Sequence, residues 1–392
     1  MIGADRPIWR SWAVLGTPIA MILALALARA SEVFSPFSYP LARQAAASVA
    51  ILAVGPFVAL VSAWEARVLL AVWGRLPVHR SWMRVVAGRV TPQVLTGCGI
   101  MTVVYVERLR DDLLHSSTTL AFYAISTAAV LAWSVVGAAL GLWLPTVIAL
   151  PAALVAPYLA MTYPASWTPL WLRHLTGVLF DCCSSSDRVS PAAVLASLLM
   201  MGALIGLSLA ALEVRLGPSK PRLDRVALMV VATVSLAVAG VSSARALGAL
   251  PTEARPASEL VCERNVCVWP EELGVIDANS RAWLEVQGAL FALEVDLGAT
   301  RIAPIAASGM LPMVVSTTDR QVAMVAMTLN FASLVDRCFD SETAEIRFGA
   351  AEQLTRLLAA ELGVTEEVGF DEGTADTRTA SELYALLTQC AQ

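Results

Sequence analysis

The chain has 392 residues, of which 57% are hydrophobic and only 15% charged, and its mean hydropathy is +0.67. Soluble globular domains carry roughly 25% charged residues, so this composition excludes an ordinary soluble protein and indicates an integral membrane protein. Residues 1–249 carry 18 basic and 10 acidic side chains (net +8), whereas residues 250–392 carry 9 basic and 22 acidic ones (net −13). We therefore predict a transmembrane domain over 1–249 and a separate C-terminal domain over 250–392.

Seven apolar runs approach the roughly 20 helical residues that cross a bilayer core. The predicted fold is thus a polytopic α-helical membrane protein of about seven transmembrane helices. The runs lie near residues 12–30, 46–64, 92–106, 118–143, 146–163, 191–213 and 226–245. The third run is the weakest because it is short and contains Gly97 and Gly99, so a re-entrant segment there, leaving six spans, stays open.

Basic residues in the short loops predict the orientation. The N-terminus and the loops 65–90 and 214–225 together hold eleven Lys and Arg residues, against five in the opposite set. We expect a multi-pass protein of the cell membrane with a cytoplasmic N-terminus. An odd number of spans then makes the C-terminal domain extracytoplasmic. The first run could instead be a signal peptide, since Ala28-Arg29-Ala30 resembles a cleavage site, but its length favours a span.

The predicted cytoplasmic loop between the second and third runs is basic and aromatic. It includes Trp73, Arg75, Arg80 and Trp82. Trp favours headgroup depth, and an amphipathic segment of this kind lies at a membrane surface. We expect these four residues to dock a soluble partner protein. A loop that only sets topology and contacts anionic lipid is the alternative.

The fifth run contains two internal prolines, Pro151 and Pro157. Each proline removes a backbone donor and distorts a helix, which membranes tolerate where neighbours or water satisfy the freed carbonyl groups. We expect a bend near a transport pathway. A static kink inside the bundle is the alternative.

Small residues recur at close-packing spacing in the fourth and sixth runs, as Gly137 with Gly141 and Gly202 with Gly206. This spacing fits packing within one bundle as well as dimerisation. No Asp, Glu, Lys, Arg or His lies near the middle of a predicted span. That absence from the sequence disfavours an ion-coupled transporter, because such carriers need intramembrane charge.

The C-terminal domain is predicted to be α+β with helices dominant. An amphipathic run covers 278–296 and a short strand covers 310–316, and helical runs lie near 318–336, 343–362 and 377–391. Its lack of His excludes a zinc-protease motif and a Ser-His-Asp triad, so we name no catalytic residue, metal or cofactor. Acidic pairs arise readily among 22 acidic residues, and the segment 364–377 lacks EF-hand spacing for Ca²⁺.

Six of the seven cysteines fall on the predicted outer side, where disulfides form. We predict Cys262 bonded to Cys267 across a β-hairpin whose turn is 263–265, and Cys338 bonded to Cys390. Four cysteines allow three pairings, and free buried thiols are the alternative. We predict no state for Cys182 and Cys183.

The layout resembles the membrane subunits of ABC-2-type exporters. The matching features are the loop 65–90, an outer segment 165–187 that resembles a re-entrant or interfacial helix, and the run 191–213. The seventh run and the "CVWPE" stretch at 267–271 look like a permease-like subgroup of actinobacteria with an extra extracytoplasmic domain. This resemblance implies a homodimer or heterodimer in the lipid bilayer with bound ATP-binding subunits, and no nucleic acid.

The predicted function is therefore a permease subunit of an exporter or flippase, powered by a separate ATPase because the chain has no Walker A motif. In this prediction the outer domain recognises cargo or a partner. The alternative is a non-transporting anchor or sensor that presents an extracytoplasmic ligand-binding domain. An intramembrane enzyme ranks last, since the runs contain no catalytic constellation at depth.

Overall fold

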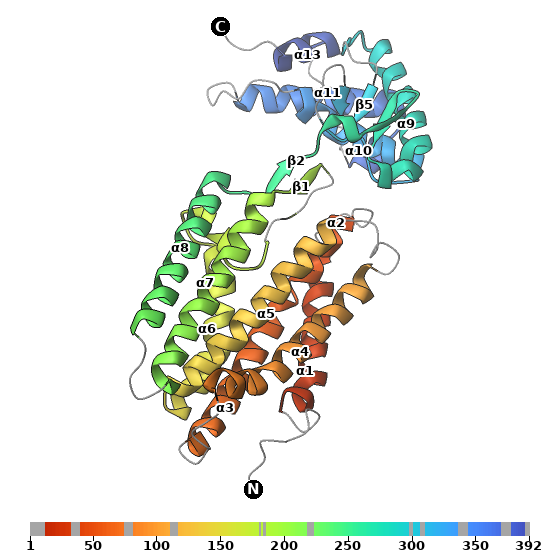
Figure 1. Ribbon diagram of the computed structural model, residues 1–392. Helices are drawn as coiled ribbons and strands as arrows, with labels where there is room; N and C mark the ends of the chain where they lie inside the picture. Colours follow the sequence, from red (N-terminus) through yellow and green to blue (C-terminus); the bar gives the residue numbers. More distant parts are fainter. Residues whose placement is uncertain are drawn as a thin grey trace. The chain divides into compact units, whose positions relative to one another are not determined.

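The structure is a computed structural model of the chain (Figure 1). It describes residues 12–32, 40–73, 81–109, 117–179, 182, 186–217, 223–297, 301–305, 310–335, 344–369 and 378–388. The chain divides into two compact units, unit 1 (Met1–Ala254) and unit 2 (Arg255–Gln392). We describe each unit by itself.

Unit 1 is a bundle of helices that lie side by side (Figure 1). Its helices are α1 (Trp12–Glu32), α2 (Pro40–Ser48), α3 (Ile51–Trp73), α4 (Trp82–Leu109), α5 (Ser117–Trp143), α6 (Thr146–Thr162), α7 (Pro191–Leu216) and α8 (Leu223–Leu247). Within the described residues, six helical stretches are long and apolar enough to cross a membrane. They are Trp12–Ser31, Leu41–Ala71, Leu120–Trp143, Thr146–Ala165, Pro191–Leu216 and Asp224–Leu247. This architecture is consistent with a helical membrane protein.

The third predicted run lies in α4, which is not among those six apolar stretches. At 28 residues, α4 is about 42 Å long, which exceeds the thickness of a bilayer core. The helix is unbroken through Gly97 and Gly99. The segment expected to be weak is thus a continuous helix whose polar residues lower its mean hydropathy.

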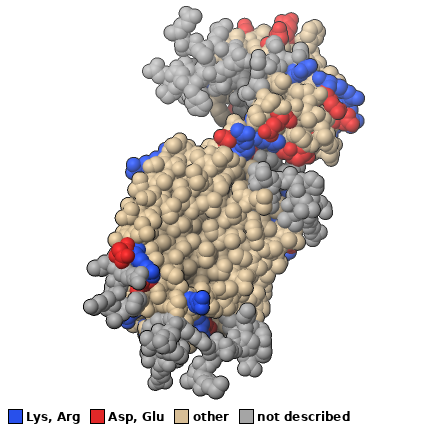
Figure 2. Space-filling model, in the orientation of Figure 1, with Lys and Arg blue, Asp and Glu red and all other residues tan. Residues whose placement is uncertain are grey.

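Charged side chains are sparse on the part of the surface of unit 1 that the structure describes. Figure 2 shows one face that is largely tan, with the described Lys, Arg, Asp and Glu residues near its ends. Large apolar side chains such as Ile19, Val147 and Leu228 are more than half exposed on this unit. Exposed apolar side chains without charge between them suit contact with lipid.

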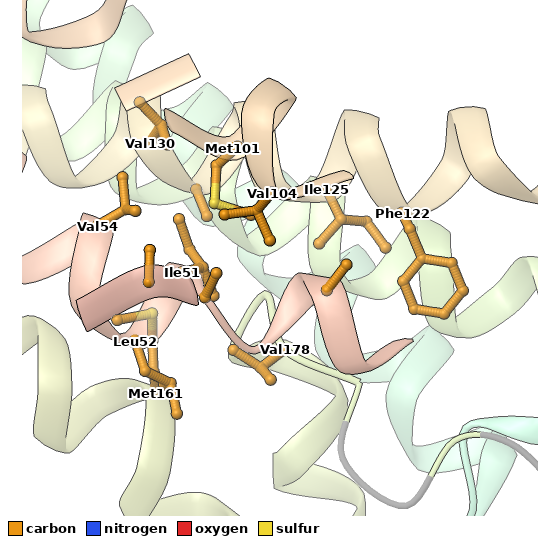
Figure 3. Packing of buried hydrophobic residues seen from close by; sticks show 14 of the residues in the cluster. Ile51, Leu52, Val54, Met101, Val104, Phe122, Ile125, Val130, Met161 and Val178 are labelled. Carbon is orange, nitrogen blue, oxygen red and sulfur yellow. The ribbon is translucent and has the colours of Figure 1, made fainter. Parts of the chain in front are cut away.

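The core of unit 1 is built where α1 to α5 meet, with α6 and α7 packed against it. Figure 3 shows Ile51 and Val54 of α3, Met101 and Val104 of α4 and Val130 of α5 among its members. The interdigitated side chains are mostly Ala, Val and Ile, which let the helix backbones approach closely.

Both small-residue patterns pack helices of the same chain against one another. A Cβ atom added at Gly137 would lie 2.1 Å from the Ala59 carbonyl oxygen, and one at Gly141 would lie 2.3 Å from the Ala63 carbonyl oxygen. A Cβ atom at Gly206 would lie 2.4 Å from the Thr233 hydroxyl oxygen. The patterns therefore serve the α3–α5 and α7–α8 contacts within one bundle.

The described part of the segment before α7 contains no α-helix, unlike the re-entrant or interfacial helix expected over 165–187. It contains two short 3₁₀ helices, η3 (Tyr163–Ala165) and η4 (Leu170–Leu175), with a cis peptide bond between Thr168 and Pro169. Two strands close this end of unit 1, because β1 (Asp187–Val189) pairs antiparallel with β2 (Thr252–Ala254). Ser190 then caps α7 by accepting a hydrogen bond from the Ala192 amide at 3.3 Å, ahead of Pro191 at the first helical position.

Unit 2 has a small four-stranded sheet in the order β3-β4-β5-β6. The strands are β3 (Val261–Glu263), β4 (Val266–Val268), β5 (Arg301–Ala303) and β6 (Met310–Pro312), and only the β3–β4 pair is antiparallel. Four helices occur where helical runs were predicted: α9 (Ile276–Ala292), α10 (Arg320–Val335), α11 (Ala344–Leu362) and α13 (Ala380–Thr388). Three further helices are short, namely α12 (Thr365–Val368) and the 3₁₀ helices η5 (Ala257–Glu259) and η6 (Pro270–Val275). The unit buries its own apolar core around Trp283, Phe331, Leu354 and Leu383.

The predicted disulfide between Cys262 and Cys267 is present, and these residues face each other in the β3–β4 register. The turn is one residue shorter than predicted, because Glu263 pairs with Val266 inside the ladder and only Arg264 and Asn265 connect the strands. Cys182 is also disulfide-bonded. Cys183, Cys338 and Cys390 lie outside the described residues.

Candidate functional site: the α3–α4 end of the bundle

Five helices of unit 1 converge where α3 ends and α4 begins. A second apolar cluster forms there, from residues of α3, α4, α5 and α7: Ala66, Leu69, Trp82, Val86, Val90, Val135, Ala138, Leu142, Leu212 and Leu216. The first turns of α4 are amphipathic, since Trp82, Val86 and Val90 are buried at i, i+4 spacing while Met83 and Arg84 are exposed. We name the first turns of α4, residues 82–90, together with this cluster the anchored elbow.

The indole of Trp82 lies inside the bundle. Its Nε1 atom donates a hydrogen bond to Oε2 of Glu213 on α7, and the Glu213 residue is only 3% exposed. A buried carboxyl group is costly unless it is hydrogen-bonded, so this contact satisfies Glu213 and fixes the start of α4 to α7. Its apolar ring is part of the buried cluster that α3, α4, α5 and α7 form, and the depth expected for Trp82 in the membrane stays a prediction.

Two further polar contacts tie the same end of α3 to its neighbours. Arg89 of α4 lies 3.1 Å from the Glu65 carboxylate of α3, and both side chains are largely buried. Two residues further along α3, Nε of Arg67 donates to the hydroxyl of Thr146 at the start of α6, at 3.2 Å. A charge pair withdrawn from water is less screened than one on the surface, so Arg89 and Glu65 hold α4 and α3 in register.

The last turns of α5 and α7 are joined by Trp143. Its Nε1 atom donates to the carbonyl oxygen of Ala211 at 3.1 Å, and the Arg215 guanidinium lies 5.8 Å from the centre of the indole ring. Cations are attracted to the faces of aromatic rings at such distances. Side-chain contacts thus join α3, α4, α5, α6 and α7 to one another at this end of the bundle.

The four predicted docking residues fall unevenly within the structure. Trp73 is the last residue of α3, and its side chain is outside the described residues, as are Arg75 and Arg80 in the segment 74–80. Trp82 alone is placed, and it contacts Glu213. The sequence interpretation missed Glu213, although an acidic residue near the end of an apolar run is the signal that could have revealed it.

Both proposed pathway prolines lie inside α6. Pro157 is buried and Pro151 exposed, and the helix continues through both. The prolines cannot donate to the carbonyl groups four residues earlier, those of Val147 and Ala153. Met161 near the end of α6 packs close to Gly55 of α3, which attaches this helix to the core. Their role in a pathway stays a prediction.

The "CVWPE" stretch of unit 2 forms a polar stack around Arg255. Its guanidinium lies 4.0 Å from the centre of the fully buried Trp269 ring, and it pairs with the Glu271 carboxylate. Glu272 is 2% exposed and accepts a hydrogen bond from the Ser316 hydroxyl at 2.7 Å. Burial raises the pKa of the Glu272 carboxyl group. This motif therefore stabilises the junction between η6 and the hairpin.

Among the described parts of the chain, no group of three or more His, Cys, Asp or Glu side chains is arranged to hold a metal ion. Comparisons with protein-family models, with curated proteins and with solved structures gave no match.

Proposed function

We propose that this chain is the membrane permease subunit of an ABC-type exporter or flippase, powered by a separate ATPase, whose C-terminal domain recognises cargo or a partner. The observation that carries the proposal is the anchored elbow. Its helix α4 follows directly on a segment that contains Arg75 and Arg80, and its first turns are fixed to α7 by Trp82 and Glu213.

Force applied to the segment 74–80 would reach the interior of the bundle through this elbow. The pair of Arg89 with Glu65 joins α4 to α3, and packed helices move as bodies past one another in conformational transitions. A soluble partner that changes shape during a hydrolysis cycle needs such a rigid lever. The positive charge of the segment suits a partner with an acidic surface.

The proposed orientation has the N-terminus and the elbow in the cytoplasm, where ATP is available. Unit 2 then lies outside the cytoplasm as a soluble domain. The Cys262–Cys267 disulfide supports this arrangement, because such bonds persist in oxidising compartments. Homodimers or heterodimers with two ATP-binding subunits complete the proposed assembly.

The first test is purification of the tagged full chain from its native membrane in mild detergent, followed by mass spectrometry. We expect a stoichiometric protein with Walker motifs. The variant Arg75→Glu/Arg80→Glu should lose that protein, whereas the charge-matched variant Arg281→Glu/Arg301→Glu, which changes exposed residues of unit 2, should retain it. Equal recovery by both folded variants would reject docking at this segment.

A second test separates docking from transmission. Trp82→Phe removes the hydrogen bond to Glu213 but keeps an aromatic ring, and Trp64→Phe changes an indole that is 39% exposed on α3. We expect Trp82→Phe to keep the bound ATPase but to uncouple its hydrolysis from transport, while Trp64→Phe leaves both unchanged. Full coupling in Trp82→Phe would refute the lever.

One observation favours a second candidate, a non-transporting membrane anchor or sensor. Unit 2 has a large apolar core of its own, with fully buried Trp283, Phe331 and Leu354, so it forms a separate body that the spans could simply present. In that case no ATPase co-purifies with the tagged chain, and the functional partner binds to unit 2.

A further inference from the structure

We propose that unit 1 contains a small water-filled polar recess between α3 and α4, at the level of Ser62 and Gln93. Both side chains are 1% exposed. The hydroxyl oxygen of Ser62 and both amide atoms of Gln93 have no hydrogen-bond partner among the residues that the structure describes. Neither residue belongs to the proposed docking and lever contacts.

The register of the two helices places these residues opposite each other. Arg89 of α4 pairs with Glu65 of α3 at one level. Eight residues along α4, a Cβ atom at Gly97 would lie 2.9 Å from Val58, so the helices run antiparallel and also touch at this second level. Gln93 is halfway between Arg89 and Gly97, about 6 Å from each along the axis. The matching midpoint on α3 falls at residues 61 and 62, where Ser62 lies.

The chemistry of these groups fits water or another small neutral molecule. A glutamine amide both donates and accepts, and a serine hydroxyl does the same, whereas neither carries charge. Polar groups in hydrocarbon cannot obtain hydrogen bonds from the solvent, so buried ones are paired or bound to ordered water. Two facing groups that do not bond directly are commonly bridged by water.

A route for that water begins at the anchored elbow. The Arg89 side chain is 24% exposed and Glu65 is 10% exposed, so this ion pair lies between the outside of the bundle and the recess. One helical turn separates Arg89 from Gln93. On the other side the recess ends at Gly97, where Val58 and Val130 close the gap with apolar side chains. The recess is therefore closed by apolar side chains at Gly97, and the Arg89–Glu65 ion pair covers its end at the elbow.

Cysteine labelling of the full chain in opened membrane fragments tests the recess. In a Cys98→Ala background, Ser62→Cys and Gln93→Cys would be treated with the small neutral reagent methyl methanethiosulfonate, with the parent chain as the baseline. The matched controls are Val58→Cys and Val90→Cys, which lie on the same two helices and are also buried. The recess positions should react at least about tenfold faster than the controls, because only a hydrated thiol forms the reactive thiolate readily.

A second pair of variants distinguishes a hydrated recess from local opening of the helices. Gln93→Leu should abolish the labelling of Ser62→Cys, since it fills the recess with an apolar side chain, whereas Val90→Leu should leave the labelling unchanged. Labelling of Ser62→Cys at the rate of Val58→Cys, or labelling that survives Gln93→Leu, would overturn the proposal. The result is independent of any bound ATPase, so a dry recess leaves the proposed function untouched.

Discussion

The contact between α3 and α5 yields a prediction whose size follows from the structure. In Gly137→Ala, the new Cβ atom would lie 2.1 Å from the Ala59 carbonyl oxygen. Carbon and oxygen atoms in close contact are about 3.3 Å apart, so the two helices must separate by about 1 Å. If roughly forty atom pairs across the interface each lose about 40% of a well about 0.15 kcal/mol deep, the loss is about 2 kcal/mol.

The matched control is Gly99→Ala on α4, where an added Cβ atom meets nothing within 4 Å. Both variants gain the same helix propensity, about 1 kcal/mol, so their difference isolates the interface. We expect Gly99→Ala to melt at or above the wild-type temperature in detergent, and Gly137→Ala to melt well below it. Gly137→Ala/Gly141→Ala should melt lower still.

Two outcomes would refute this reasoning. Equal melting temperatures for Gly137→Ala and Gly99→Ala would mean that α3 and α5 do not approach as described. If Gly137→Ala kept its melting temperature but lost a dimer in crosslinking, the small-residue pattern would serve contact between chains. The assay thus separates the two interpretations that the sequence left open.

Three further predictions concern the disulfide and the two buried ionisable groups outside the spans. Replacing Cys262 and Cys267 by Ser removes a disulfide of sequence separation 5 and should destabilise unit 2 by about 2 kcal/mol. Pulse proteolysis of the full chain with a C-terminal tag would measure this loss. Unchanged proteolysis would mean that the β3–β4 ladder holds the hairpin without the disulfide. His174 is 1% exposed, its Nε2 lies 3.1 Å from the Gly248 carbonyl oxygen, and burial lowers its pKa below the ordinary 6.5. As the pH falls, the unfolded chain therefore protonates His174 before the folded chain does, which favours unfolding. The melting temperature should fall as the pH drops below about 6.5, and His174→Gln should flatten this pH dependence. Burial raises the pKa of the Glu272 carboxyl group, so the folded state keeps this proton at a higher pH than the unfolded chain does. The stability of unit 2 should therefore fall as the pH rises above about 4.5 and through that raised pKa. Glu272→Gln should remove this pH dependence in the same proteolysis assay, and a pH dependence that persists would belong to another group.

The sequence was most informative where one local property decides the structure. Runs of apolar residues about 20 long demand helices in a bilayer, so most of the predicted spans coincide with helices of unit 1. The hairpin was also a local signal, since Cys262 and Cys267 are separated by only four residues, of which Arg264 and Asn265 form the turn. Ser190 and Pro191 are a local signal of the same kind, since a capping hydroxyl followed by a proline at the first helical position begins α7.

Predictions that depended on the surroundings of a residue were incomplete. The re-entrant or interfacial helix expected over 165–187 is not present in the described residues there, which contain short 3₁₀ helices, because prolines at 164 and 169 limit helix length. The candidate docking residues were chosen from charge and aromatic character along one loop. Whether an indole faces lipid or a neighbouring helix depends on what packs beside it, and Trp82 packs against α7.

The sequence by itself thus determined that this chain is helical and apolar enough for a membrane, because hydrophobic length needs no long-range information. It favoured the Cys262–Cys267 bond among three possible pairings, and the structure contains that bond. Only the tertiary structure decided which partners the polar residues have. Glu213 and Trp82 are 131 positions apart, and Arg89 and Glu65 pair across helices that run antiparallel. Such pairings follow from the register of packed helices, which depends on every side chain in the interface and is not written in any one stretch of the chain.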